Sequence, residues 1–143
     1  MYADKQHITA VCDNCVLSLD TGTGQLGGRY SYKGILKHFD IVSDKCVLHY
    51  HDVSSNANVL TVLNNSAEAE AAASLRANTS CVRIDADGIS VLEGTHLVTY
   101  DNDLTGKKEM SLANDGFTEF VKIGKSLFLL GYDTINKVDI PEE

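Results

Sequence analysis

The sequence predicts an all-β fold built from antiparallel sheets. Short stretches rich in Val, Ile, Leu, Tyr and Phe alternate with clusters of Gly, Asn, Asp and Ser about every eight to twelve residues, a spacing typical of strands joined by turns. The chain also contains an internal duplication with a repeat spacing of about 81 residues. Its 143 residues, 43% of them apolar, suffice for one domain with a buried core, so we assign residues 1–143 to a single domain.

Two pairs of segments carry the duplication. ITAVCDNCVLSLD (8–20) aligns with ISVLEGTHLVTYD (89–101), and FDIVSDKCVLHYHD (39–52) aligns with FVKIGKSLFLLGYD (120–133). Within the first half, AVCDNCVLSL aligns with IVSDKCVLHY at a spacing of about 31 residues. We therefore expect a first β half over 7–63 and a second β half over 81–140.

The apolar stretches define the predicted strands in chain order. They cover 7–12, 15–20, 29–32, 35–42, 46–51, 58–63, 81–85, 89–92, 95–101, 108–112, 117–123, 126–131 and 135–140. Each aligned unit has turn residues near its centre, where tight hairpins favour Asn, Asp and Gly; these are Asp13-Asn14, Asp44-Lys45, Gly94-Thr95 and Lys125. We expect the core stripe to contain Leu17, Leu19, Leu48, Tyr50, Val98, Tyr100 and Leu129, and the opposite face, with Ser18 and Thr99, to be solvated.

One segment between the halves departs from the strand pattern. NNSAEAEAAASLRAN is rich in Ala, with Glu early and Arg late, and Asn65 followed by Glu68 has the form of a capping box. These features predict a short helix over about 66–77, within a helical connector over 64–80.

The Cys-x-x-Cys of VCDNCVL raises the question of a metal or redox site. The aligned units hold Ser43, Glu93 and Gly124 in place of Cys12, and Cys46, His96 and Leu127 in place of Cys15, so no chemistry is repeated there. A structural zinc site needs four suitable ligands. We interpret the two cysteines as the flanks of a hairpin turn, with no cofactor.

His49 and His51 in VLHYHD alternate along a predicted strand, so both face the same side, as two metal ligands would. The aligned units carry Ser18 and Thr99 on that side. Solvated polar residues are therefore our interpretation, with a metal site as the alternative.

The segment DNDLTGKKE (101–109) is the candidate metal loop. Asp101, Asp103, Thr105 and Glu109 offer oxygen ligands, and Gly106 permits a sharp turn, as in calcium loops. An EF-hand would also need an acidic residue where Leu112 stands and a helix after it. A polar hairpin loop, in which Asp side chains bond to their own backbone, is therefore our interpretation, with a calcium loop as the alternative.

Charge and composition narrow the classes of partner. Twenty acidic residues outnumber twelve basic ones, giving a net charge of −8, which is opposite in sign to a nucleic-acid-binding surface. No apolar run approaches the roughly 18 residues of a membrane span. The N-terminal MYADKQHITA does not resemble a secretion signal, so we expect a cytoplasmic protein with reduced cysteines that binds neither nucleic acid nor membrane.

Two stretches resemble the repeats of quinoprotein-like β-propellers. CVLSLDTGTGQ (15–25) has their strand followed by Leu-Asp-x-x-Thr-Gly, and LVTYDNDLTGKK (97–108) is similar with one residue added. The tryptophan that follows the turn in that family is missing, because the chain contains no Trp. The resemblance implies a scaffold of small antiparallel sheets that serves as a binding platform. Oxidoreductase chemistry is not implied, because no matching residue carries it.

Three functional hypotheses follow. The first is a non-catalytic scaffold that binds a protein partner or self-associates through free strand edges. The second is a virus or phage structural protein, such as a head-decoration, tail or baseplate component, located in the virion. The third is a small-molecule binder or enzyme with a cleft between the halves, near Tyr50, Tyr100, His49 and His96. The Gly-rich DTGTGQLGG (20–28) opens no helix and is interpreted as a flexible connection rather than a phosphate site.

Overall fold

The computed structural model describes residues 1–141, whose regular structure consists of strands alone. In chain order they are β1 (Tyr2–Ala3), β2 (His7–Val11), β3 (Cys15–Asp20), β4 (Leu26–Ser31), β5 (Gly34–Val42), β6 (Lys45–Asp52), β7 (Ala57–Asn64), β8 (Ala69–Leu75), β9 (Thr79–Asp85), β10 (Gly88–Glu93), β11 (His96–Tyr100), β12 (Lys107–Ser111), β13 (Glu119–Ile123), β14 (Ser126–Leu130) and β15 (Ile135–Asp139). Every strand predicted from the sequence is present, and β1 and β8 are additional.

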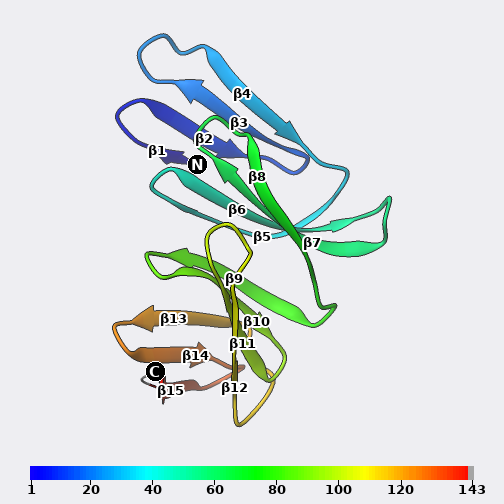
Figure 1. The fold of residues 1–143 in the computed structure, drawn as a ribbon, viewed down its shortest axis with the longest axis vertical. Helices are drawn as coiled ribbons and strands as arrows, with labels where there is room; N and C mark the ends of the chain where they lie inside the picture. The colour runs from blue at the N-terminus through cyan, green and yellow to red at the C-terminus, as the bar shows by residue number, and fades with distance from the viewer. Residues whose placement is uncertain (142–143) are drawn as a thin grey trace.

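The strands form four antiparallel sheets, each made of strands that follow one another in the chain. We call them sheet I (β1–β4), sheet II (β5–β8), sheet III (β9–β12) and sheet IV (β13–β15). The sheets are stacked in chain order along the long axis of the molecule (Figure 1). Strand β9 lies against both β5 and β13, so the first strands of sheets II to IV are neighbours. The predicted all-β antiparallel fold is confirmed.

Three apolar clusters hold neighbouring sheets together. Between sheets I and II the cluster contains Val16, Tyr32, Cys46, Leu48, Tyr50, Leu63 and Ala67. Between sheets II and III it contains Val47, Leu60, Val62, Leu75, Val82, Ile84, Ile89, Val91, Val98 and Tyr100. Between sheets III and IV it contains Cys81, Leu92, Leu97, Leu112, Phe117, Phe120, Leu127 and Leu129. Each fully buried Val, Leu, Ile or Phe stabilises the fold by roughly 1.5–3 kcal/mol.

The four predicted bends are all two-residue hairpin turns, over 13–14, 43–44, 94–95 and 124–125, so the turn predicted at Asp44-Lys45 lies one residue earlier. Ser43, Gly94 and Gly124 begin their turns with φ of 53°, 60° and 58°; hairpin turns favour such positive values. The spacing of about 81 residues therefore relates equivalent turns. The spacing of about 31 is wrong by one residue. The turns at 13–14 and 43–44 are 30 residues apart, so Cys46 is equivalent to Val16 rather than to Cys15.

The predicted core stripe is only partly correct. Leu17 and Leu19 remain partly exposed, whereas Ser18 and His49, expected in solvent, are 1% and 2% exposed. In sheet I, the face with Val16 and Ser18 packs against sheet II, and Leu17 and Leu19 lie on the opposite face. His49 is buried because sheet II is covered by a neighbour on both of its faces, so alternate residues of its strands are buried on either side.

The predicted helical connector is wrong, because β8 occupies that segment and pairs with β7. The Asn64 side chain caps the tight turn before it: its Oδ1 accepts from the N–H groups of Ser66 (2.9 Å) and Glu68 (3.0 Å). Ala71 of β8 packs against the cluster between sheets II and III. Pairing and burial thus outweigh the helix propensity of alanine. Residues 1–141 contain no helix long and apolar enough to cross a bilayer.

Candidate functional groove

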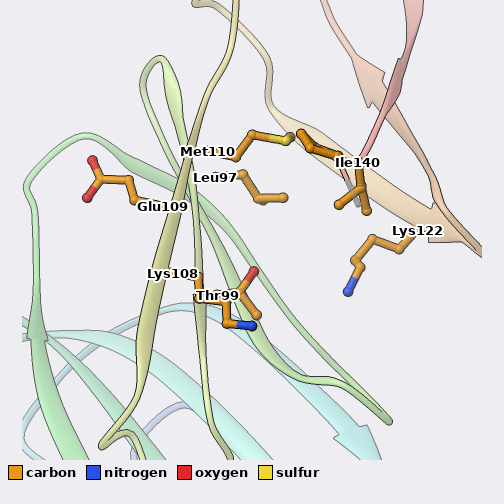
Figure 2. A pocket seen from close by; sticks show the side chains of 8 residues that line it. Leu97, Thr99, Lys108, Glu109, Met110, Lys122 and Ile140 are labelled. Atoms are coloured by element: carbon orange, nitrogen blue, oxygen red, sulfur yellow. The ribbon is translucent and has the colours of Figure 1, made fainter. Parts of the chain in front are cut away.

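A groove with a volume of about 400 Å³ lies between sheets III and IV (Figure 2). Its lining residues are Leu97, Thr99, Lys108, Glu109, Met110, Lys122, Ile140 and Pro141. Figure 2 shows Leu97 and Met110 on one side, with Ile140 and Lys122 facing them from sheet IV and the segment after it. The groove is therefore a seam between two sheets, not a hole within one sheet.

Strand pairing sets the position of the groove's side chains. Leu97 on β11 pairs with Met110 on β12, and Thr99 pairs with Lys108; cross-strand partners project from the same face. Leu97 is 4% exposed and belongs to the cluster between sheets III and IV, against which Met110 and Ile140 pack. The floor of the groove is thus the partly buried edge of that apolar cluster.

Lys122 joins the two sheets at the mouth of the groove. Its Nζ lies 3.3 Å from the carboxylates of both Asp85 and Asp87, at the β9–β10 turn of sheet III. The side chain is only 13% exposed, and the two carboxylates hold its ammonium group in place. The groove consequently combines an apolar floor with a fixed positive charge that is already balanced.

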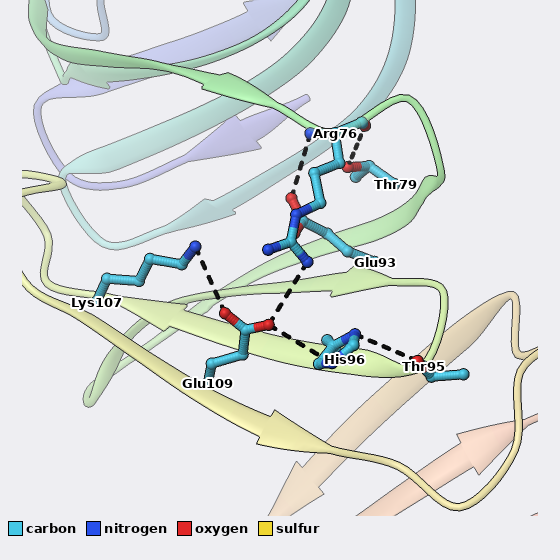
Figure 3. A network of polar contacts seen from close by, with 7 residues as sticks. All are labelled: Arg76, Thr79, Glu93, Thr95, His96, Lys107 and Glu109. Atoms are coloured by element: carbon cyan, nitrogen blue, oxygen red, sulfur yellow. Dashed lines mark hydrogen bonds and ion pairs between the residues drawn. The ribbon is translucent and has the colours of Figure 1, made fainter.

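A polar network lies beside the groove and is centred on Glu109 (Figure 3). Its carboxylate lies 3.5 Å from Arg76, 3.6 Å from His96 and 3.6 Å from Lys107. Desolvation opposes ionisation of Glu109, but the neighbouring Arg76, Lys107 and His96 charges prevail and lower its pKa. Arg76 also reaches Glu93, which is 2% exposed, at 3.5 Å. The network links the connection between β8 and β9 to sheet III.

The predicted calcium ligands fall in two different settings. Asp101, Asp103 and Thr105 belong to the β11–β12 connection, where Asp103 Oδ1 accepts from the N–H (3.1 Å) and hydroxyl (2.6 Å) of Thr105. Glu109, on β12, contacts the three basic side chains described above. Among residues 1–141 no group of three or more His, Cys, Asp or Glu side chains is arranged to hold a metal. Calcium binding by this loop stays an untested alternative to the polar hairpin loop.

Cys12 and Cys15 flank a hairpin turn, as predicted. The N–H of Cys12 donates to the carbonyl of Cys15 at 2.8 Å, which closes the turn over Asp13 and Asn14. Both cysteines are free thiols.

His49 is buried, contrary to the expectation that it is solvated. Its Nε2 lies 3.4 Å from Asn58 Oδ1, and its ring stacks on His38 with 5.5 Å between centroids. Burial lowers the pKa of His49 to about 4, so the side chain is neutral at pH 7. His51, by contrast, is half-buried.

The cleft expected near Tyr50, Tyr100, His49 and His96 does not form. Tyr50 packs on Tyr32 with 4.7 Å between ring centroids, between sheets I and II. Tyr100 belongs to the cluster between sheets II and III, and His96 to the Glu109 network. The sequence could not indicate this separation, because successive sheets stack instead of facing one another as two halves.

The Gly-rich segment and the Asp-x-x-Thr-Gly stretch form a self-contained turn. Asp20 Oδ1 accepts from the N–H (2.8 Å) and hydroxyl (3.0 Å) of Thr23. Gly24 follows with a φ of 69°, a conformation that glycine adopts without strain. The motif therefore serves to reverse the chain between β3 and β4.

The sequence does not predict the groove. Its lining comes from three strands and the segment after β15, spread over residues 97–141, and each stretch reads as ordinary strand. The one available signal was Met110, an apolar residue in the otherwise polar KKEMS.

Comparisons with known proteins identify the architecture. No protein-family model matches the sequence, and a search of curated proteins gives no match. The crystal structure of BamB from Moraxella catarrhalis is similar, with a TM-score of 0.59 and 10% identity over 95% of this chain and 40% of that chain. The structure of Saccharomyces cerevisiae Sqt1 has a TM-score of 0.49 and 8% identity over 91% of this chain and 53% of that chain.

BamB is a β-propeller, so the likeness shows a β-propeller-like fold. The chain spans less than two thirds of the length of either protein. The predicted resemblance to β-propeller repeats is thus supported at the level of the fold.

Proposed function

We propose that the protein is a non-catalytic β-repeat scaffold that binds a protein partner in the groove between sheets III and IV. The observation that carries this proposal is the apolar floor formed by Leu97, Met110 and Ile140, open to solvent between two sheets. A groove of about 400 Å³ lies within the size range of recognition pockets. It has room for one or two apolar side chains of a partner segment.

Two features of the groove favour a protein over a charged small molecule. The positive charge of Lys122 is already balanced by Asp85 and Asp87, so an anion would have to compete with two carboxylates. The walls offer apolar contact instead, and burial of apolar side chains drives most protein association. β-Propeller-like stacks of sheets present such seams on rigid elements.

Site-specific photo-crosslinking tests the groove. A photo-reactive amino acid replaces Met110 in the groove, and the matched control replaces Val53, an apolar residue that is 61% exposed in the turn between β6 and β7. In cells that express the protein, we expect a discrete crosslinked polypeptide from position 110 and none from position 53. Met110→Lys should remove that partner from a pull-down, whereas Val53→Lys should retain it. Identical crosslinks at both positions, or none at position 110, would refute the proposal.

Symmetric assembly through strand edges is the second candidate, and the virion is one setting for it. The observation that favours it is that sheet IV has three strands where the other sheets have four. Its third strand, β15, is therefore an edge strand, whereas the third strand of each other sheet pairs with a fourth within residues 1–141. Unpaired backbone groups at such an edge can accept another strand. Hydrogen exchange tests this: the β15 amides should become protected as protein concentration rises, and protection that is independent of concentration would exclude it.

A further inference from the structure

Sheets I and IV each have an apolar face that no other sheet covers within residues 1–141. The sheet I end face carries Ile8, Ala10, Leu17 and Leu19, from the cross-strand pairs Ile8↔Leu19 and Ala10↔Leu17. The sheet IV end face carries Val121, Phe128, Leu130 and Ile135, from the pairs Val121↔Phe128 and Leu130↔Ile135.

The sheet IV end face is the more exposed of the two. Val121, Leu130 and Ile135 are 53%, 43% and 71% exposed. Glu119 and Lys137 share this face as the cross-strand partners of Leu130 and Phe128, so charge borders the apolar patch. Exposed apolar patches rimmed by polar residues mark sites of interaction. The internal duplication relates each end face to a surface that is buried between sheets II and III, and so indicates which kind of surface would pack on it.

The sheet I end face corresponds to a surface that is buried inside the chain. Its residues precede Ile89, Val91, Val98 and Tyr100 of sheet III by the repeat spacing of about 81 residues. Those four residues pack against sheet II, and they form the same cross-strand pairs, Ile89↔Tyr100 and Val91↔Val98. The sheet I end face therefore has the register and the apolar character of a surface that receives a sheet II.

The sheet IV end face corresponds to the other side of that same interface. Phe128 follows Val47 of sheet II by about 81 residues, and its partner Val121 follows Asp40 by the same spacing. Val47 pairs with Asp40 and is fully buried against sheet III. The interface between sheets II and III thus has its two complementary surfaces repeated, one at each end of the stack.

We propose that the sheet IV end face of one copy packs on the sheet I end face of a second copy, and the reverse, so that two chains close a ring of eight sheets. Contact between two different surfaces must either close into a ring or continue as a filament. β-Propellers typically close with four to eight sheets, and the stack of four matches 40% of the BamB chain. Two such stacks related by a twofold axis bury all four end faces. The proposal does not depend on partner binding in the groove.

The oligomeric state of the full chain tests the proposal, measured by light scattering coupled to size-exclusion chromatography. We expect the wild-type protein to have the mass of a dimer. Val121→Lys on the sheet IV end face and Leu17→Asp on the sheet I end face should each give monomers, since each variant places an unpaired charge in both interfaces of the ring. The dissociation constant should rise by more than about a hundredfold. Val53→Asp, an apolar-to-charged change away from both end faces, should remain a dimer.

Mixing the two monomeric variants provides the sharper test. A mixed pair joins the unaltered end faces at one interface and brings the introduced ammonium group against the introduced carboxylate at the other, so we expect dimers to return. Circular dichroism of each variant checks that it folds. Four outcomes would each overturn the two-copy ring: a wild-type monomer, a dimer that survives both substitutions, a particle of three or more copies, or a mixture that does not dimerise.

Discussion

Replacing Gly28 by alanine should separate sheet I from sheet II. A Cβ atom at Gly28 would lie 1.8 Å from the carbonyl oxygen of Ser66, whereas ordinary contact begins near 3.4 Å. The loop that carries Ser66 must therefore move by about 1.6 Å, the difference between these distances. That loop also holds the carbonyl of Asn65, which accepts a hydrogen bond from Ser18 Oγ at 2.5 Å.

The two losses set the expected magnitude. Overpacking against backbone costs about 1–3 kcal/mol, and a lost hydrogen bond costs about 1 kcal/mol. We therefore expect Gly28→Ala to lower the free energy of unfolding by about 2–4 kcal/mol, measured by equilibrium unfolding in urea.

The neighbouring glycine provides the matched control. A Cβ atom at Gly27 would meet nothing closer than 3.6 Å, so Gly27→Ala should change the free energy of unfolding by less than about 0.5 kcal/mol. Equal stabilities of the two variants would show that the sheets are not in the close contact described here.

Three further predictions concern charges. Arg76→Ala removes the ion-pair partner of the Glu93 carboxylate, which is 2% exposed, and leaves it only the backbone N–H of residue 76 at 3.4 Å. The loss should be about 1–3 kcal/mol, less than for a fully buried pair because Arg76 is half exposed; adding Glu93→Gln should restore part of this loss in urea unfolding. Burial lowers the pKa of His49 from its ordinary 6.5 to about 4, so between these values the unfolded chain binds a proton that the folded chain does not. Stability should be fully present above pH 6.5 and decrease as the pH falls toward 4, by on the order of 3 kcal/mol; His49→Gln should flatten this dependence in pH-dependent thermal unfolding, and an unchanged slope would contradict it. Calcium at millimolar concentration should leave the melting temperature unchanged, because Glu109 already forms ion pairs with Arg76 and Lys107 and Asp103 accepts a hydrogen bond from Thr105; a rise that a chelator reverses would instead establish a calcium site.

The strands could be predicted well from the sequence, but the way the sheets stack could not. Local signals located the turns, because Gly94 and Gly124 mark positive φ and Asp20 with Thr23 marks a self-bonded loop. Burial was harder to predict, since His49 and Ser18 have polar side chains typical of a solvated face and are buried only because a neighbouring sheet covers them. The segment 69–75 was misassigned because alanine favours helices locally, whereas its pairing with β7 is a property of the whole sheet. The groove combines residues from separate strands, and no local sequence pattern predicts that these residues lie together.

Each sheet is assembled from consecutive strands, and this has a consequence for how the chain folds. Nearly all backbone pairing closes only short loops, so each sheet can form as a local unit before it docks on the next one. Unfolding should accordingly proceed unit by unit, and the three-stranded sheet, which has one uncovered face and the fewest ladder bonds, should open first.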